Sequence, residues 1–180
     1  CLTLRQKDPT IKIVGYDKDI AVRNRAKKIG LCKVESNLDN AVSGSQLIVL
    51  CVPVGQMQAV TRRLKKIIEP GTTVTDVGSV KLSVIEEIES NIESVGGKYV
   101  PSHPIAGTER SGPDAGYAGL FEGRWCILTP TRKTNKKALN SLETFWKFLG
   151  MQTKIMTPEH HDLVLACLLY TSPSPRDSTL

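Results

Sequence analysis

The segment VPSHPIAGTERSGP, residues 100–113, gathers a histidine, a threonine, a glutamate and an arginine on a stretch rich in proline and glycine. Histidine is the usual general base near neutral pH, so His103 is the first candidate for a proton-transfer group. Loops that a rigid scaffold holds in place concentrate catalytic and binding groups. The alternative is a solvated connecting loop in which the histidine has only a structural role. The elements on either side of the loop distinguish the two interpretations.

A second candidate is the turn DVGSVK, residues 76–81, which follows a predicted strand. Gly78 permits a tight turn, and Ser79 stands where the next helix is expected to begin. The Ser79 hydroxyl and the free amides of that helix would face the crevice above the strand ends, where open α/β sheets bind ligands. An ordinary helix-capping role for Ser79 fits equally well.

Asp17 ends the first predicted strand, IKIVGYD, and is the third candidate. A carboxylate there can accept hydrogen bonds from both hydroxyls of an adenine ribose, and it would repel a 2′-phosphate. The position therefore favours NAD over NADP. The alternative is that Asp17 caps the helix predicted over residues 18–30.

Strands and helices alternate along the chain, and this alternation positions the three candidates. It predicts the α/β class, as a Rossmann-like, doubly wound, mostly parallel sheet with helices on both faces. The predicted strands are 11–17, 46–52, 72–78, 97–104, 125–130 and 151–156. The predicted helices are 18–30, 38–44, 54–68, 80–93, 136–150 and 158–166.

The N-terminal region has the pattern of an incomplete dinucleotide-binding unit. Residues 1–8 resemble the second half of a helix, and the strand that follows ends in an acidic residue. Both features are typical of the second half of such a βαβ unit. No GxGxxG motif occurs in the 180 residues. We therefore expect the first strand and its glycine-rich turn to precede residue 1.

Composition excludes several classes of protein. Hydrophobic residues make up 40% and charged residues 23%, as in ordinary soluble domains, and no apolar run approaches the roughly 18–20 residues of a membrane span. The net charge of +6 comes from short basic groups without interleaved aromatic residues, so nucleic-acid binding is not expected. The five cysteines are scattered, which predicts reduced thiols in the cytoplasm and no metal site. Cys51 and Cys126 lie in apolar runs and are expected in the core.

Four motifs, in order, carry a resemblance to a known family. DVGSVK, SHPIAGTERSGP, GLFEGRWCILTP (119–130) and MTPEHHDLVLA (156–166) together resemble the prephenate/arogenate dehydrogenase family. The resemblance implies oxidative decarboxylation of prephenate or arogenate on the route to tyrosine, with NAD as the cofactor and NADP not excluded. It also implies a cytoplasmic enzyme that forms a homodimer through a helical domain.

The same resemblance implies roles for individual residues. His103 would contact the substrate's ring hydroxyl and accept its proton, and Ser79 would assist at that hydroxyl. Glu109, with Thr108 and Gly107, would lie at the substrate pocket. The positions expected to line the cofactor cleft are Asp17, Val52, Pro53, Gly78 and Ser79. His160 and His161 match family positions near a domain junction, where they are expected to be structural or to support a residue that contacts the substrate.

The C-terminal region departs from the family pattern at Cys167. We expect an NAD(P)-binding domain over 1–156, the start of a helical domain over 157–167, and a non-native or disordered tail over 168–180. The family's Ser-His-Leu-Pro-His segment and its carboxylate-binding arginine are absent, so the fragment itself is expected to be nearly inactive. Two alternatives remain: a β-hydroxyacid dehydrogenase-like reductase, and a nucleotide-binding module without chemistry.

Overall fold

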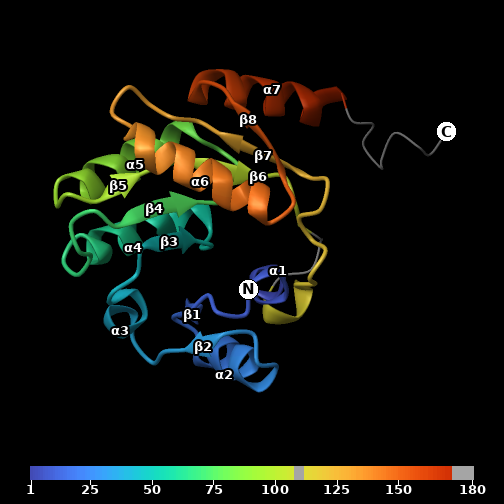
Figure 1. Ribbon diagram of the computed structural model, residues 1–180. Coiled ribbons are helices and arrows are strands. Elements are labelled where there is room, and N and C mark those ends of the chain that lie inside the picture. The colour runs from blue at the N-terminus through green and yellow to red at the C-terminus, as the bar shows by residue number, and fades with distance from the viewer. Residues whose placement is uncertain (108–111, 172–180) are drawn as a thin grey trace.

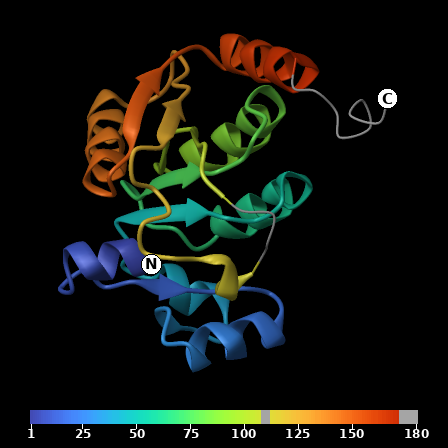
Figure 2. The same cartoon turned by 90° about the vertical axis from the view of Figure 1, so that its right-hand side faces the viewer.

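The computed structural model describes residues 1–107 and 112–171, with side chains described as far as Cys167. Within these residues the chain alternates strands and helices, and this confirms the α/β class with parallel strands. Figure 1 shows the strands as a central layer, and Figure 2 shows α6 on one side of it and α4 and α5 on the other. No helix in the described part combines the length and the hydropathy that a bilayer span requires.

The strands form three hydrogen-bonded ladders, of which two have three strands and one has two. β3, β4 and β5 are parallel, β6 is antiparallel to β7, and β7 is parallel to β8, while β1 and β2 form a separate parallel pair. The bounds are β1 Val14–Gly15, β2 Lys33–Val34, β3 Leu47–Leu50, β4 Thr73–Asp76, β5 Lys98–Tyr99, β6 Ser102–Pro104, β7 Trp125–Leu128 and β8 Gln152–Ile155.

One extended run joins the two larger ladders. The strand predicted over 97–104 is divided into β5 and β6 at Val100 and Pro101. The Val100 amide still donates to Val74 of β4, whereas the carbonyl of Pro101 accepts from Thr129, after β7. Proline has no N–H to donate, so the run changes partner here. The resulting strand order is β3, β4, β5/β6, β7, β8.

The helices cover two hydrophobic clusters. One cluster joins β3 and β4 to α3, α4 and α5, and the other joins β7 to α6. In the second cluster Trp146 packs edge-to-face against Phe121 and Phe145. The bounds are α1 Leu2–Lys7, α2 Ile20–Lys28, α3 Leu38–Val42, η1 Val54–Gln56, α4 Met57–Leu64, α5 Leu82–Glu93, η2 Pro113–Ala115, α6 Lys136–Phe148 and α7 Pro158–Thr171.

Several predicted boundaries were wrong for local reasons. The helix predicted over 54–68 is a 3-10 turn followed by α4, and the helix predicted over 80–93 begins only at Leu82. α7 continues four residues into the predicted tail, because no helix breaker precedes the Ser-Pro step that ends at Pro173. Cys126 is buried as expected, but Cys51 is exposed because it follows the end of β3.

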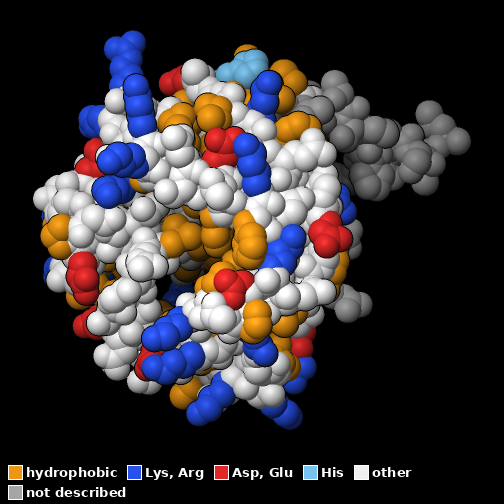
Figure 3. All heavy atoms as spheres, in the orientation of Figure 1, with side chains coloured by type: hydrophobic (Ala, Val, Ile, Leu, Met, Phe, Trp, Pro, Cys, Tyr) orange, Lys and Arg blue, Asp and Glu red, His pale blue; other side chains and the backbone are white. Residues whose placement is uncertain are grey.

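The β1–β2 ladder lies beside the rest of the sheet, close to α3 (Figure 1). Tyr16, just after β1, packs against the cluster that includes Val52 and Val54. Figure 3 shows that the face between this ladder and β3 is hollowed, with hydrophobic side chains in its walls. Within the described residues β1 pairs only with β2, and β3 pairs only with β4.

Candidate active site

The predicted site residues converge on one edge of the sheet. β3, β4 and β5/β6 are parallel, so the segments that follow them leave at the same edge, the usual ligand-binding side of an open α/β sheet. A cavity of about 350 Å³, largely open to solvent, lies at the end of β6. Its lining residues are His103, Pro104, Ile105, Ala106, Gly107 and Arg124.

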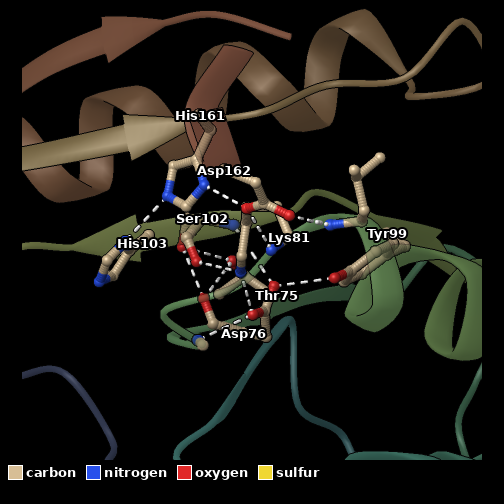
Figure 4. A network of polar contacts seen from close by, with 10 residues as sticks. Thr75, Asp76, Lys81, Tyr99, Ser102, His103, His161 and Asp162 are labelled. Atoms are coloured by element: carbon tan, nitrogen blue, oxygen red, sulfur yellow. Dashed lines mark hydrogen bonds and ion pairs between the residues drawn. The ribbon is translucent and has the colours of Figure 1, made fainter. Parts of the chain in front are cut away.

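Beneath this edge lies a fully buried ion pair. Neither the Lys81 ammonium nor the Asp76 carboxylate is exposed, and the two groups are in direct contact (Figure 4). Asp76 also accepts hydrogen bonds from the Tyr99 hydroxyl (2.8 Å) and the Gly78 amide (2.8 Å). Burial lowers the pKa of Lys81, and the neighbouring Asp76 opposes that shift. Burial, together with the charge of Asp76, raises the pKa of Tyr99 well above its usual value.

The same network binds the Ser79 turn to the strand that carries His103. Lys81 Nζ donates to the carbonyl of Ser102 at 2.9 Å, and the Ser102 hydroxyl donates to the carbonyl of Asp76 at 2.8 Å. Thr75 contacts the Ser102 hydroxyl at 2.8 Å. Because Ser79 lies between Asp76 and Lys81, and His103 follows Ser102, the network fixes the turn and the strand against each other.

His103 lies within β6, where it is only partly buried and pairs with Ile127 of β7. Its Nδ1 is 2.9 Å from Nε2 of His161, and Figure 4 shows its other ring nitrogen pointing away from the network. Burial is the largest cause that lowers the pKa of His103, to about 4, and the neighbouring His161 and Lys81 lower it further. The imidazole is therefore neutral at physiological pH, which is the state a proton acceptor needs.

Ser79 is exposed, and it does not cap the following helix. The capping role belongs to Asp162 of α7, whose two carboxylate oxygens accept from the amides of Lys81 (2.8 Å) and Leu82 (3.0 Å). The helix-cap alternative for Ser79 is thus wrong. Residue 78 has to be glycine because its backbone lies close to the Asp76 side chain: a Cβ there would lie 2.9 Å from an oxygen of Asp76.

Asp17 and the segment after β3 form a neighbouring group. The residue that caps α2 is Asp19, and Asp17 instead accepts from the Asp19 amide at 2.8 Å. The adjacent Lys18 donates to Gln56 in η1 at 2.8 Å, which links the segment that carries Asp17 to the segment after β3. The hydrogen bonds of this group are separate from those of the Asp76 network, although both groups lie at the same edge of the sheet.

Of the predicted substrate-pocket residues, Gly107 lines the cavity, while Thr108 and Glu109 lie outside the described residues. Sequence reasoning missed Arg124, which the antiparallel pairing of β6 and β7 brings to the cavity. It expected His161 to be structural or to support a residue that meets the substrate, and it overlooked Asp162. A usable signal was the motif EHHD at the start of a helix, since it places a carboxylate beside two imidazoles. Among residues 1–107 and 112–167 there is no group of three or more side chains arranged to hold a metal ion.

The fold and the edge at which these residues meet define a nucleotide-binding α/β domain. The family model for the prephenate dehydrogenase nucleotide-binding domain matches residues 1–155, and the chain belongs to this family. This confirms the resemblance drawn from the four motifs. More distant reductase structures, such as an imine reductase from Pseudomonas sp. at 15% identity and a TM-score of 0.64, share the fold alone.

Among curated relatives, the chain is 39% identical over 159 residues to the cyclohexadienyl dehydrogenase of Zymomonas mobilis, covering 88% of this chain and 54% of that protein. It is 30% identical over 171 residues to the prephenate dehydrogenase of Bacillus subtilis, covering 93% of this chain and 45% of the relative. The chain therefore spans about half the length of the curated relatives it matches.

Solved structures of the family superpose closely on the chain. Prephenate dehydrogenase from Aquifex aeolicus, in complex with hydroxyphenyl propionate and NAD⁺, gives a TM-score of 0.81 at 29% identity over 97% of this chain and 65% of that one. Arogenate dehydrogenase from Synechocystis gives a TM-score of 0.84 at 26% identity over 93% of this chain and 58% of that one.

Proposed function

We propose that this chain is the nucleotide-binding part of an enzyme that oxidatively decarboxylates prephenate or arogenate with NAD⁺. The observation that carries the proposal is the neutral His103 at the cavity, locked by the Asp76–Lys81 network to the turn that presents Ser79. A non-catalytic nucleotide-binding module has no need of a buried ion pair that fixes these two segments together.

His103 is the proton acceptor in this proposal. The substrate's ring hydroxyl gives its proton to the imidazole nitrogen that does not contact His161, so the O–H bond breaks and its electron pair stays on oxygen. This raises the hydride-donating power of the attached carbon. Ser79 hydrogen-bonds to the same hydroxyl and orients it, and a rigid turn makes that orientation effective. Loss of carbon dioxide and aromatisation of the ring supply the driving force.

NAD fits the second group of residues. The Asp17 carboxylate is not used as a helix cap and would accept the ribose hydroxyls, while Val52, Pro53 and Gly78 would line the cleft beside it. When bound, the nicotinamide would supply the hydride acceptor. We further propose that a strand preceding residue 1 pairs with the open edges of β1 and β3 at the hollow in Figure 3 and carries the glycine-rich turn.

The substrate pocket in this proposal is the cavity at the end of β6. Gly107, Thr108 and Glu109 would form one wall. Arg124 contributes a positive charge to the lining, which suits a substrate that carries carboxylates. The 180-residue chain would turn over little substrate alone, because it spans about half of its relatives, and the remaining part would supply a helical domain and the contacts of a homodimer. We expect an enzyme of this kind to be located in the cytoplasm.

The test uses the whole protein encoded by the source gene. We expect NADH formation with prephenate, arogenate or both, and a fall in kcat of about 10²- to 10⁴-fold in His103→Asn, since general-base catalysis contributes that much. Arg124→Gln should raise KM and leave kcat nearly unchanged. A folded protein that binds NAD and turns over neither substrate would contradict the assignment. So would a His103→Asn variant of full activity, the result expected of a β-hydroxyacid dehydrogenase-like reductase.

A further inference from the structure

Three side chains form a hydrogen-bonded line behind the cavity. Asp162 Oδ1 lies 2.7 Å from Nδ1 of His161, and Nε2 of His161 lies 2.9 Å from Nδ1 of His103 (Figure 4). The His161 side chain is fully buried, and the two imidazole rings meet edge-to-face. The first two residues belong to α7 and the third to β6, so the line is made by packing and not by sequence proximity.

Which atom donates in each hydrogen bond of the line can be worked out from Asp162. Its two oxygens accept from the backbone amides of Lys81 and Leu82, which no protonated carboxyl oxygen would do as well. Partial burial acts to raise the pKa of Asp162, but the hydrogen bonds from Leu82, His161 and Lys81 together lower it. The carboxylate is therefore ionised and accepts only, so Nδ1 of His161 must donate to it.

Because Nδ1 of His161 is a donor, the roles of its Nε2 and of the two ring nitrogens of His103 follow. A His161 ring with its proton on Nδ1 has a lone pair on Nε2, which accepts from Nδ1 of His103. A neutral His103 protonated on Nδ1 then keeps its free lone pair on Nε2. This is the nitrogen that points away from the network, and His103 is part of the cavity lining.

We propose that His161 and Asp162 are positioning residues that hold His103 in the Nδ1–H tautomer, so that Nε2 is the proton acceptor at the cavity. The inference rests on the proposed role of His103 as the base. When Nε2 takes the substrate proton, the new imidazolium donates through Nδ1 to His161, and the carboxylate at the end of the line stabilises the charge. Without this line the ring is free to carry its proton on Nε2, where it has no lone pair for the substrate.

The chain has only three histidines, which makes the tautomers directly observable. With ¹⁵N-labelled histidine, the nitrogen chemical shifts of the 180-residue chain show which ring nitrogen of His103 carries the proton. We expect Nδ1–H in the unchanged chain. His161→Phe removes the acceptor and should shift His103 largely to Nε2–H. His161→Gln should keep Nδ1–H, because its amide oxygen can accept.

His160→Gln is the matched control, since the exposed neighbouring imidazole is outside the line and its loss should leave the His103 shifts unchanged. A purely structural role for His161 predicts the same His103 tautomer in all four proteins. That result would overturn the proposal, as would Nε2–H in the unchanged chain. The spectrum of the unchanged chain decides the tautomer even where His161→Phe fails to fold.

In the whole enzyme, His161→Phe should lower kcat about 10- to 100-fold with little change in KM, by analogy with the loss of groups that orient metal-binding histidines. His161→Gln should recover part of that loss, and His160→Gln should show none. An unchanged kcat in His161→Phe would overturn the proposal. Nδ1–H in a protein that turns over neither substrate would contradict the proposed function and leave the tautomer assignment standing.

Discussion

Lys81 and Asp76 are the two residues on which the geometry of the site depends most. Both are removed from water, and such desolvation costs several kcal/mol per ion, which the mutual attraction and the hydrogen bonds of Tyr99 and Gly78 offset. A buried pair of this kind adds little net stability. We infer that its effect is on specificity, because its partners come from both the turn and β6 and would be left unpaired if either moved.

Breaking the pair should therefore be costly. Lys81→Met leaves Asp76 buried without its counter-ion, and we expect the free energy of unfolding to fall by about 3–5 kcal/mol in urea denaturation. Lys133→Met is the matched control, since Lys133 pairs with Glu89 but is 69% exposed, and its loss should cost below about 1 kcal/mol. Equal effects of the two substitutions would show that burial does not matter here.

The depressed pKa of His103 predicts a pH dependence of stability. His103 titrates near pH 4 when folded and near 6.5 when unfolded, so between these values the unfolded chain binds more protons. Stability therefore falls as pH falls from 6.5 to 4. The groups that set this shift besides burial are His161, Lys81, Asp76 and Asp162.

Replacing His103 isolates this contribution. The difference in unfolding free energy between the unchanged chain and His103→Gln should change by about 1 kcal/mol between pH 7 and pH 4, after allowance for the partial exposure of the ring. At low pH the unchanged chain loses this additional unfolding free energy relative to His103→Gln. A difference that stays constant across this range, measured by urea unfolding, would contradict the neutral state of His103. His160→Gln serves as the reference.

At the residue scale, the sequence identified the groups that follow strand ends and missed those that depend on packing. His103 and Gly78 were found because their neighbours specify strand and turn locally. His161 lies 58 residues from His103 in the sequence, and its contact requires α7 to pack against β6. No local pattern encodes that contact, although the two adjacent histidines and Asp162 mark the helix as unusual.

Among the elements, the turn after β4 is the most constrained. The backbone at Gly78 approaches Asp76 so closely that any side chain would displace the carboxylate or the Met57 methyl group, which lies 3.3 Å from the position of a Cβ. The turn therefore holds Ser79 by steric restriction as well as by hydrogen bonds.

Gly78→Ala should destabilise the chain by about 1–3 kcal/mol, the usual cost of inserting a methyl group into a filled site. Gly55→Ala is the control, because a Cβ at Gly55 meets no atom within 4 Å and its backbone is not left-handed. The measurement is thermal or urea unfolding of the two variants beside the unchanged chain. If the Gly78→Ala protein were as stable as the Gly55→Ala protein, the turn would accommodate a methyl group and the predicted steric restriction would be wrong.

Element boundaries followed from the sequence where local signals were strong. The continuous apolar run near residue 48 became β3, and α6 begins after the cap Asn135. The two-residue strand β2, Lys33–Val34, carries too little pattern to be recognised. The change of partner within 97–104 depends on which neighbouring strand is in reach, and a single sequence does not reveal that.

At the scale of the whole molecule, two groups of residues face one edge from different parts of the fold. Asp17 follows β1, Ser79 follows β4, and His103 lies in β6. Under the proposed function, discrimination at the adenine ribose and proton transfer at His103 belong to separate parts of the structure, and a change at Asp17 should leave proton transfer intact.

Asp17→Ser in the whole enzyme tests this separation. Removing the carboxylate relieves its repulsion of a 2′-phosphate, worth ~1–2 kcal/mol near a surface, so the preference for NAD over NADP in kcat/KM should fall by about tenfold. Asp19→Ser is the matched control, since serine also caps helices and the preference should not change. Equal shifts in both variants would place the ribose contact elsewhere.

The Phe121–Phe145–Trp146 cluster has a spectroscopic consequence. Trp146 is only 2% exposed and packs against the other two rings. Within the described residues its indole N–H has no hydrogen-bond partner. Its fluorescence should therefore be blue-shifted and sensitive to global unfolding. Trp125, the chain's second tryptophan, is 46% exposed and follows Arg124 at the cavity. Because Trp125 is already exposed to water, the change in fluorescence on unfolding should come mainly from Trp146, so the integrity of the core can be followed without a label.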